Sequence, residues 1–301
     1  RTELETERLL TTPRHYAYLK ISEGCNWKCG YCAIPLIRGP HVSVPMETLL
    51  EEARKLAARG VREIMVIAQD TTYYGIDLYG RRRLAELLTA LCRIDDIEWI
   101  RLHYAYPTAF PDDVIDVMAS EPKICKYLDI PFQHISDRML TAMKRRHTKA
   151  DALALIERLR ERIPDIALRT TLLVGYPTET EQDMQELEQF VRDVRFDRLG
   201  VFAYSEEEGT YSARELRDDV PEEEKQRRVD RIMRLQEGIS LENNLARVGR
   251  TMRVIVDSRQ GDYYVARSQY DSPEVDQEIL IPAAAHQLRR GHFYDARITA
   301  A

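Results

Sequence analysis

The sequence predicts an α/β protein in two parts, a partial (βα)6 barrel followed by a small antiparallel β-barrel. Through residue 204, six short apolar segments alternate with amphipathic helical patterns, and near residue 249 the pattern changes to short alternating strands. Strands that alternate with helices imply right-handed crossovers and a parallel sheet. Six such units are too few for the closed eightfold barrel.

The six strand segments are nearly continuous in apolar character, as expected for strands that are buried on both faces of a parallel sheet. They span residues 17–21, 63–68, 98–103, 126–130, 167–174 and 198–204.

Two of the intervening helices carry clear end signals. The helix expected at 45–60 is closed by Gly60, and the next clear case opens with Thr178 and Glu181 at the spacing of a capping box. Both helices place their apolar residues on one face, which we expect to cover the sheet. For the first helix these residues are Leu49, Ala53, Leu56 and Ala57.

A long helix is predicted from Pro221 to Gly249, because proline suits a first helical turn and glycine a helix end. Beyond it, short segments alternate in hydropathy and are separated by turn signals, which is typical of a small β-barrel. These segments are 252–258, 263–270, 278–282 and 293–300. We therefore expect one domain over residues 1–249, with the helix as its link, and a second over 250–301.

Composition restricts the class of protein. No apolar run approaches the roughly 20 residues that span a bilayer, so we expect a cytoplasmic protein without membrane contact. The net charge is −6, and proteins held mainly by phosphate contacts are usually basic. Five cysteines, of which three are clustered, do not suggest a disulfide framework. Cys92 and Cys125 lie in apolar settings and are expected to be buried packing residues.

The stretch "SEGCNWKCGYC" (22–32) follows the first predicted strand and holds Cys25, Cys29 and Cys32. Three thiolates in one loop suit a [4Fe–4S] cluster with one iron left open. A structural zinc site would need a fourth ligand, for which His15 is the nearest candidate. A redox pair of Cys29 and Cys32 would leave Cys25 unexplained. The spacing favours the cluster over these two alternatives.

The C-x3-C-x2-C spacing, with Tyr31 before the last cysteine, resembles the radical S-adenosylmethionine (SAM) superfamily. Further stretches look like its methylthiotransferase family, which places a small β-barrel called TRAM at the carboxyl end. They are "IAQDTTYYG", "RLHYAYP", "DIPFQHISDRMLTAMKRR" and "RTTLLVGYPTET". The resemblance implies a [4Fe–4S] cluster and SAM as cofactors. It also implies that the radical comes from SAM, so no side chain is assigned as catalytic.

The segment 267–282 resembles the branch that modifies the β-carbon of an aspartate on the twelfth protein of the small ribosomal subunit. Residues 245–301 hold eight Arg and seven Asp or Glu. This segment therefore carries less net positive charge than is expected for a domain that binds the tRNA backbone. RNA contact is therefore not favoured. The alternatives are a tRNA adenosine methylthiotransferase and a non-catalytic module that binds zinc or RNA. The resemblance also implies an electron donor such as flavodoxin or ferredoxin.

Ligands of parallel sheets lie at the carboxyl ends of the strands. That rule selects Gln69, residues 104–107, Gln133, His134 and residues 175–177. By resemblance, Gln69 is expected to contact the SAM amino group and Arg145 its carboxylate, while Tyr31 borders the adenine. Gln133 is a further cofactor-binding candidate, and His134 also suits a loop residue that satisfies backbone groups.

Arg169 lies within the fifth predicted strand, where a buried charge needs a partner. Either the SAM carboxylate or a neighbouring aspartate would serve.

Two departures from the family pattern matter. Thr178 stands where the family motif commonly has glycine, and we expect it to cap the following helix. Family members also carry an amino-terminal domain whose three cysteines hold a second cluster. Because Cys92 and Cys125 cannot supply three ligands, we expect a truncated or processed piece. It would hold one cluster and would not complete sulfur insertion alone.

Overall fold

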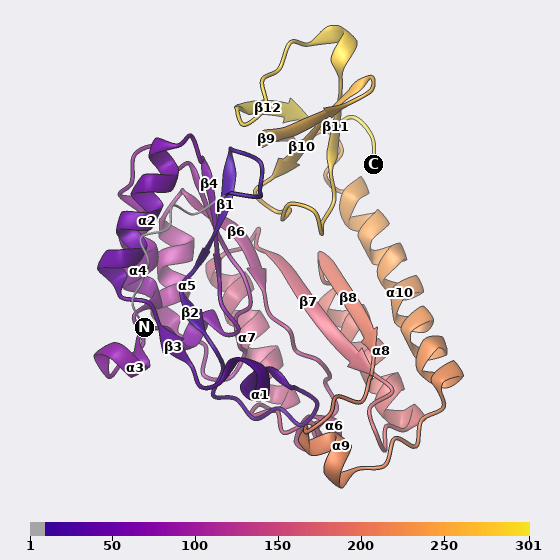
Figure 1. Ribbon diagram of the computed structural model, residues 1–301. Coiled ribbons are helices and arrows are strands. Elements are labelled where there is room, and N and C mark those ends of the chain that lie inside the picture. Colours follow the sequence, from indigo (N-terminus) through magenta and orange to yellow (C-terminus); the bar gives the residue numbers. More distant parts are fainter. Residues whose placement is uncertain (1–9) are drawn as a thin grey trace.

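A computed structural model describes residues 10–301 and shows a six-stranded parallel sheet flanked by helices (Figure 1). The strand order is β1-β4-β5-β6-β7-β8. Strands that follow one another in the chain are therefore neighbours in the sheet, apart from the two-residue strands β2 and β3, which lie outside it. The strands are β1 (Tyr16–Lys20), β4 (Glu63–Ile67), β5 (Trp99–Leu102), β6 (Ile124–Asp129), β7 (Ala167–Val174) and β8 (Arg198–Ala203). The predicted parallel α/β fold is confirmed.

Long helices follow the strands in the predicted alternation. They are α2 (Met46–Ala58), α4 (Leu84–Cys92), α5 (Asp112–Ser120), α7 (Lys149–Arg162), α8 (Glu181–Val194) and α10 (Glu222–Leu245). The stripe predicted on α2 is buried, with Leu49 and Ala53 at 0% exposure. Among residues 10–301, no helix is long and apolar enough to cross a membrane.

Short elements decorate the loops. They are β2 (Ser22–Glu23), β3 (Val42–Ser43), α1 (Ile34–Arg38), α3 (Ile76–Tyr79), α6 (Asp137–Ala142), α9 (Tyr211–Glu215), η1 (Thr71–Tyr73) and η2 (Ala283–Ala285). β2 and β3 pair as a small antiparallel ribbon that frames the cysteine loop.

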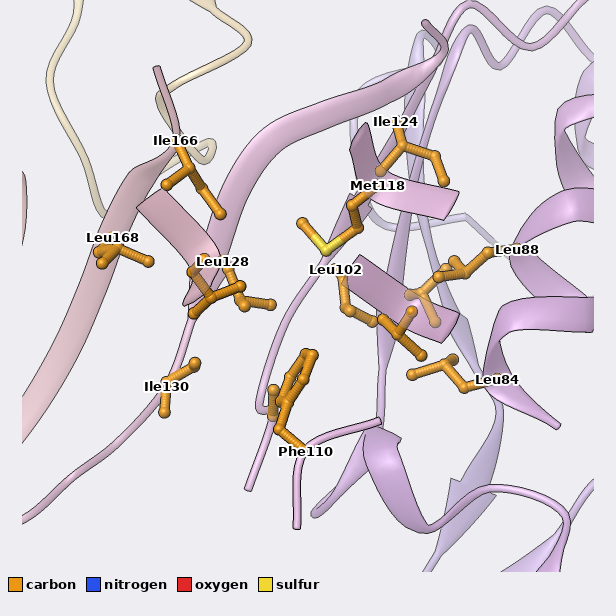
Figure 2. Packing of buried hydrophobic residues seen from close by; sticks show 14 of the residues in the cluster. Leu84, Leu88, Leu102, Phe110, Met118, Ile124, Leu128, Ile130, Ile166 and Leu168 are labelled. Atoms are coloured by element: carbon orange, nitrogen blue, oxygen red, sulfur yellow. The ribbon is translucent and has the colours of Figure 1, made fainter. Parts of the chain in front are cut away.

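The main core lies between the sheet and its helices. Figure 2 shows Leu84 and Leu88 of α4 facing Leu102 of β5, while Met118 of α5 reaches the same layer. All four are at most 1% exposed. Burying a side chain of this size contributes about 1.5–3 kcal/mol, so this layer supplies much of the stability of the barrel. Cys92 and Cys125 are also buried, as predicted.

The predicted start of α8 is wrong by two residues. Thr180, not Thr178, is the N-cap, and it forms a capping box with Asp183. Thr178 lies in a turn with φ 72°, a left-handed conformation that favours glycine. That conformation explains why glycine suits this position, and it prevents Thr178 from acting as the cap.

The carboxyl-terminal part is a curled antiparallel sheet with strand order β11-β10-β9-β12, which confirms the predicted pattern. The strands are β9 (Thr251–Gln260), β10 (Tyr263–Ser268), β11 (Ile279–Pro282) and β12 (Phe293–Arg297). Helix α10 ends at Leu245, four residues before the predicted Gly249. In Figure 1 this sheet lies at the top, beyond the amino ends of β1 and β4, and α10 runs down the side of the barrel.

Residues 267–276, which we call the plug, comprise the last two residues of β10 and most of its link to β11, and they enter the amino end of the parallel sheet. Arg267 donates to Glu63 of β4 (Nη2 to Oε2, 2.7 Å), and Arg101 of β5 donates to the other oxygen of the same carboxylate (2.9 Å). These three residues are at most 2% exposed. Arg267 also pairs with Asp257, so two cations and two anions satisfy one another with little help from water.

Further contacts fix the plug to three other strands, β1, β6 and β8, and to His103 just after β5. They are Tyr16 to Glu274 (2.8 Å), Tyr127 to Asp276 (2.8 Å), His103 to Ser272 (3.1 Å), and an ion pair between Arg198 and Asp271. The plug thus occupies the amino end of the half-barrel. The loops that remain available for ligands are those at the carboxyl ends of the strands.

Candidate functional site

The cysteine loop leaves β1 and turns sharply at Gly24, whose φ is 76°. A Cβ atom there would lie 2.2 Å from the carbonyl oxygen of Pro40 and 2.6 Å from that of Gly39. Only glycine allows this close approach of two backbone segments. Cys25 then donates its backbone N–H to the Gly39 oxygen (3.1 Å), which fixes the start of the loop.

The middle of the loop is anchored at Gly30. Its N–H donates to the Met143 oxygen (2.8 Å), and its own oxygen accepts from Ser212 N–H (2.9 Å). A Cβ at Gly30 would meet the Tyr176 hydroxyl at 2.8 Å. Ser212 belongs to a segment whose polar, acidic sequence suggests only a surface loop, so its anchoring role could not be predicted.

The thiols of Cys25, Cys29 and Cys32 are unpaired and partly exposed. Burial raises the pKa of Cys25 to about 12, and burial also raises that of Cys32, with each neighbouring thiol adding to the rise. Loss of the Cys25 and Cys32 protons is therefore unfavourable without a cation. Metal binding supplies that cation and releases the protons.

The zinc alternative finds no support in the geometry. Within residues 10–301, no three or more His, Cys, Asp or Glu side chains converge as the ligands of one ion. His15, the nearest fourth ligand, bonds Asp257 instead (2.7 Å), at the opposite end of the sheet. In a cubane each thiolate binds a different iron, so the three sulfurs need not converge on one atom.

The thioredoxin-like alternative for Cys29 and Cys32 depends on a fold that this parallel sheet does not have.

Arg145 lies three residues beyond the end of α6 and is buried, although it carries a charge. Its Nη1 is 3.4 Å from Cys29 Sγ and 3.5 Å from the Tyr31 hydroxyl, and its Nη2 donates to the Pro131 oxygen (2.6 Å). Its Nε atom is buried without a partner. The structure therefore brings Arg145 and Tyr31 together beside the cysteines, with donor capacity left over.

Gln69 follows β4 and donates from Nε2 to Glu23 (3.3 Å). Its Oε1 is buried without a partner, which is uncommon because buried polar atoms are normally hydrogen-bonded. An ammonium group would satisfy that acceptor. Free thiols, an unsatisfied acceptor and a spare guanidinium donor therefore fit an iron–sulfur cluster with a small zwitterion.

Gln133 has a φ of 70° and pairs through its backbone with β7, by donating to Thr171 and accepting from Leu173. Its side chain is half-buried at the carboxyl end of the sheet. The neighbouring His134 accepts at Nδ1 from the backbone N–H groups of Ile135 (2.9 Å) and Ser136 (3.1 Å). His134 thus satisfies backbone groups in the turn.

Arg169 is held by two carboxylates. Neither of them belongs to the cysteine loop. It lies 3.2 Å from Asp129 and 3.6 Å from Asp276 of the plug. Of the two partners considered for this charge, an aspartate is the one present. The sequence could not show this, because Asp276 is more than 100 residues away.

Two aromatic residues of the site were not predicted. Tyr106, after β5, places its hydroxyl 3.7 Å from Cys29 Sγ, and its ring stacks on Trp27 (centroids 4.1 Å apart, planes 8° apart). Trp27 in turn donates to Asp70 (2.6 Å), which also caps η1 through Thr72 N–H. The position of residues 104–107 at a strand end predicted that they lie near the site. It did not predict the contact between the Tyr106 hydroxyl and Cys29.

Comparison with known proteins agrees with this geometry. The Radical SAM superfamily profile matches residues 19–191, and the TRAM domain profile matches 248–301. The chain is 54% identical over 297 residues to ribosomal protein uS12 methylthiotransferase RimO of Bacteroides thetaiotaomicron, covering 99% of this chain and 68% of the relative. With the corresponding protein of Porphyromonas gingivalis, identity is 56% over 300 residues, covering 99% and 69%.

Solved structures share the fold at low identity. Coproporphyrinogen III oxidase (HemN) of Escherichia coli, a radical SAM enzyme, aligns with a TM-score of 0.56 and 16% identity, over 85% of this chain and 67% of that one. The methyltransferase TsrM of Kitasatospora setae, with cobalamin and a [4Fe–4S] cluster bound, aligns with a TM-score of 0.52 and 18% identity, over 62% and 36%.

The fold, the cysteine loop and the two profiles define a radical SAM protein with a TRAM domain. At more than 50% identity over almost its whole length, the chain belongs to the ribosomal protein uS12 methylthiotransferase family.

Proposed function

We propose that this chain is a radical SAM methylthiotransferase that acts on ribosomal protein uS12, at the β-carbon of an aspartate. The observation that carries this proposal is the cysteine loop. At the carboxyl end of the parallel sheet, three free thiols share a loop, the buried Arg145 guanidinium lies beside Cys29, and the amide oxygen of Gln69, which follows β4, is orphaned. The family relationship supplies the substrate.

In this proposal Cys25, Cys29 and Cys32 hold one [4Fe–4S] cluster. Gln69 accepts from the SAM ammonium group, Arg145 binds the SAM carboxylate, and Tyr31 borders the adenine. When bound, the cluster and SAM supply a deoxyadenosyl radical by one-electron reduction. The chain orients SAM and excludes water, while the buried carboxyl-end loops hold these groups in fixed positions. Gln133 lies at the same edge and contributes to the cofactor wall.

Residues 250–301 form the TRAM domain in this proposal, and residues up to 249 form the radical SAM core. Substrate attraction follows from charge, because a net charge of −6 suits a basic ribosomal protein better than a phosphate backbone. A small electron-transfer protein such as flavodoxin or ferredoxin provides the electron.

The first test is anaerobic reconstitution of the chain with iron and sulfide. We expect about four irons per chain, and deoxyadenosine formation from SAM under reduction. Cys29→Ala should abolish both, whereas the matched Cys92→Ala, which alters a buried thiol of α4, should preserve cluster content. One tightly bound zinc without acid-labile sulfide would overturn the proposal in favour of a zinc module.

The second test identifies the substrate. Ribosomal protein uS12 carrying deuterium at its aspartate β-carbons is incubated with the reconstituted chain, SAM and reductant. We expect deuterium to appear in deoxyadenosine, as measured by mass spectrometry. Deuterium transfer from labelled tRNA and not from uS12 would support the adenosine methylthiotransferase instead.

A further inference from the structure

The hydroxyl of Tyr106 points at a cysteine sulfur, and its ring is held on both faces. The Trp27 indole stacks at 4.1 Å between centroids, and the Arg145 guanidinium carbon lies 4.2 Å from the same ring centroid. Two groups this close to one ring cannot share a face, so Tyr106 lies between them. Stacking and cation–π contacts together restrict rotation of the ring.

The Asp70 carboxylate fixes the Trp27 side of this stack. Asp70 accepts from Trp27 Nε1 (2.6 Å) with one oxygen, and its other oxygen accepts from Thr72 N–H (2.9 Å) and the Thr72 hydroxyl (2.7 Å). Asp70 is 1% exposed. A chain of contacts therefore runs from the end of β4 through Trp27 to Tyr106, which follows β5.

Tyr106 is 6% exposed, and its hydroxyl lies 3.7 Å from Cys29 Sγ, a distance suited to an O–H···S hydrogen bond. Hydrogen bonds to cluster sulfurs are one of the protein's means of setting the reduction potential of an iron–sulfur cluster. The reduced cluster carries more negative charge on its sulfurs, so a donor there stabilises the reduced form more than the oxidised form.

We infer that Tyr106 is a positioning residue that donates a hydrogen bond to the Cys29 thiolate and raises the reduction potential of the bound cluster. Trp27, held by Asp70, keeps the Tyr106 hydroxyl oriented toward the Cys29 sulfur. This inference rests on the proposed function, because it requires a cluster at the three cysteines. Tyr106, a loop residue after β5, would then help to set how readily the cluster accepts an electron.

The test is a redox titration of the anaerobically reconstituted chain without SAM, followed by electron paramagnetic resonance. Tyr106→Phe keeps the ring and removes the donor. We expect the equilibrium constant for cluster reduction to fall roughly tenfold, which is a shift of about 59 mV to more negative potential for a one-electron couple. Iron content should match that of the wild type.

Tyr73→Phe is the matched control, because Tyr73 lies edge-on to Trp27 (centroids 6.2 Å apart) and its hydroxyl can be removed without touching the Tyr106–Cys29 contact. We expect its potential to be unchanged. Trp27→Phe leaves the Tyr106 hydroxyl in place but loosens its aim, and should shift the potential in the same direction by a smaller amount.

An unchanged or higher potential in fully loaded Tyr106→Phe overturns the inference. Should that variant fail to bind iron, an unchanged potential in Trp27→Phe overturns it. Failure of the wild-type chain to assemble any cluster is a different result, because it refutes the proposed function itself.

Discussion

The two ends of the parallel sheet treat their buried polar groups in opposite ways. At the amino end the plug brings Arg267 to Glu63 and Asp257, and the charges neutralise one another. At the carboxyl end, buried polar atoms are left without partners. Seven of the nine buried side-chain atoms without a hydrogen bond in residues 10–301 lie there. Two of the seven, His134 Nε2 and Glu179 Oε2, face each other 3.4 Å apart, and the other five are on Ser22, Gln69, Arg145 and His147.

This difference indicates that the amino end of the sheet stabilises the fold, whereas the carboxyl end binds ligands. Satisfied buried charges hold two domains together, and removing one partner leaves the other uncompensated. Unsatisfied buried groups cost free energy in the empty protein, and they persist where a ligand completes them. Barrel enzymes generally divide these tasks in the same direction, with ligands at the carboxyl end.

The largest effect should come from the amino end. Arg267→Ala removes the cation that buried Glu63 shares with half-buried Asp257, and we expect a loss of about 3–5 kcal/mol in the free energy of unfolding. Chemical denaturation measures it. Arg195→Ala, which breaks the exposed pair with Glu242, should cost less than about 1 kcal/mol. Equal losses would show that the plug does not stabilise the fold.

His147 provides a pH test of the carboxyl end. Burial, reinforced by the Arg145 charge, lowers the pKa of His147 from 6.5 to about 4. The unfolded chain therefore takes up a proton before the folded one does, so stability falls as pH decreases from 6.5 towards 4. The fall attributable to this group is up to about 3 kcal/mol.

Denaturation of cluster-free chain at several pH values tests this expectation. In His147→Gln the loss of stability on acidification should be smaller by that amount. An identical pH dependence in both proteins would mean that His147 acquires a partner or water that the structure does not show.

Gln69→Ala should affect ligand affinity rather than stability. Removing an acceptor for a charged donor costs about 1.5 kcal/mol of binding, so SAM should bind the reconstituted protein roughly tenfold more weakly by calorimetry. The free energy of unfolding should fall by at most about 1 kcal/mol, because Oε1 has no partner to lose and only the 3.3 Å hydrogen bond from Nε2 to Glu23 is removed. Gln185→Ala on the exposed face of α8 is the control. Unchanged SAM affinity would exclude Gln69 from the cofactor site.

The smallest effect concerns backbone strain beside the site. Thr178→Gly should stabilise the protein by up to about 1 kcal/mol, because φ 72° is unfavourable for a residue with a Cβ atom. Thermal unfolding measures the change. Thr180→Ala should instead cost about 1 kcal/mol, because Thr180 is the N-cap of α8. The opposite signs would confirm which threonine caps the helix.

The sequence alone determined the six parallel strands, the antiparallel carboxyl-terminal sheet and the cysteine loop. These depend on local information, namely apolar runs, hydropathy period and cysteine spacing, which the chain order expresses directly. Only the tertiary structure decided how Arg169 is paired, that Tyr106 faces Cys29, and that Thr178 does not cap α8. Each of these depends on a contact between distant segments or on a backbone angle set by such contacts, and composition and periodicity carry no record of either.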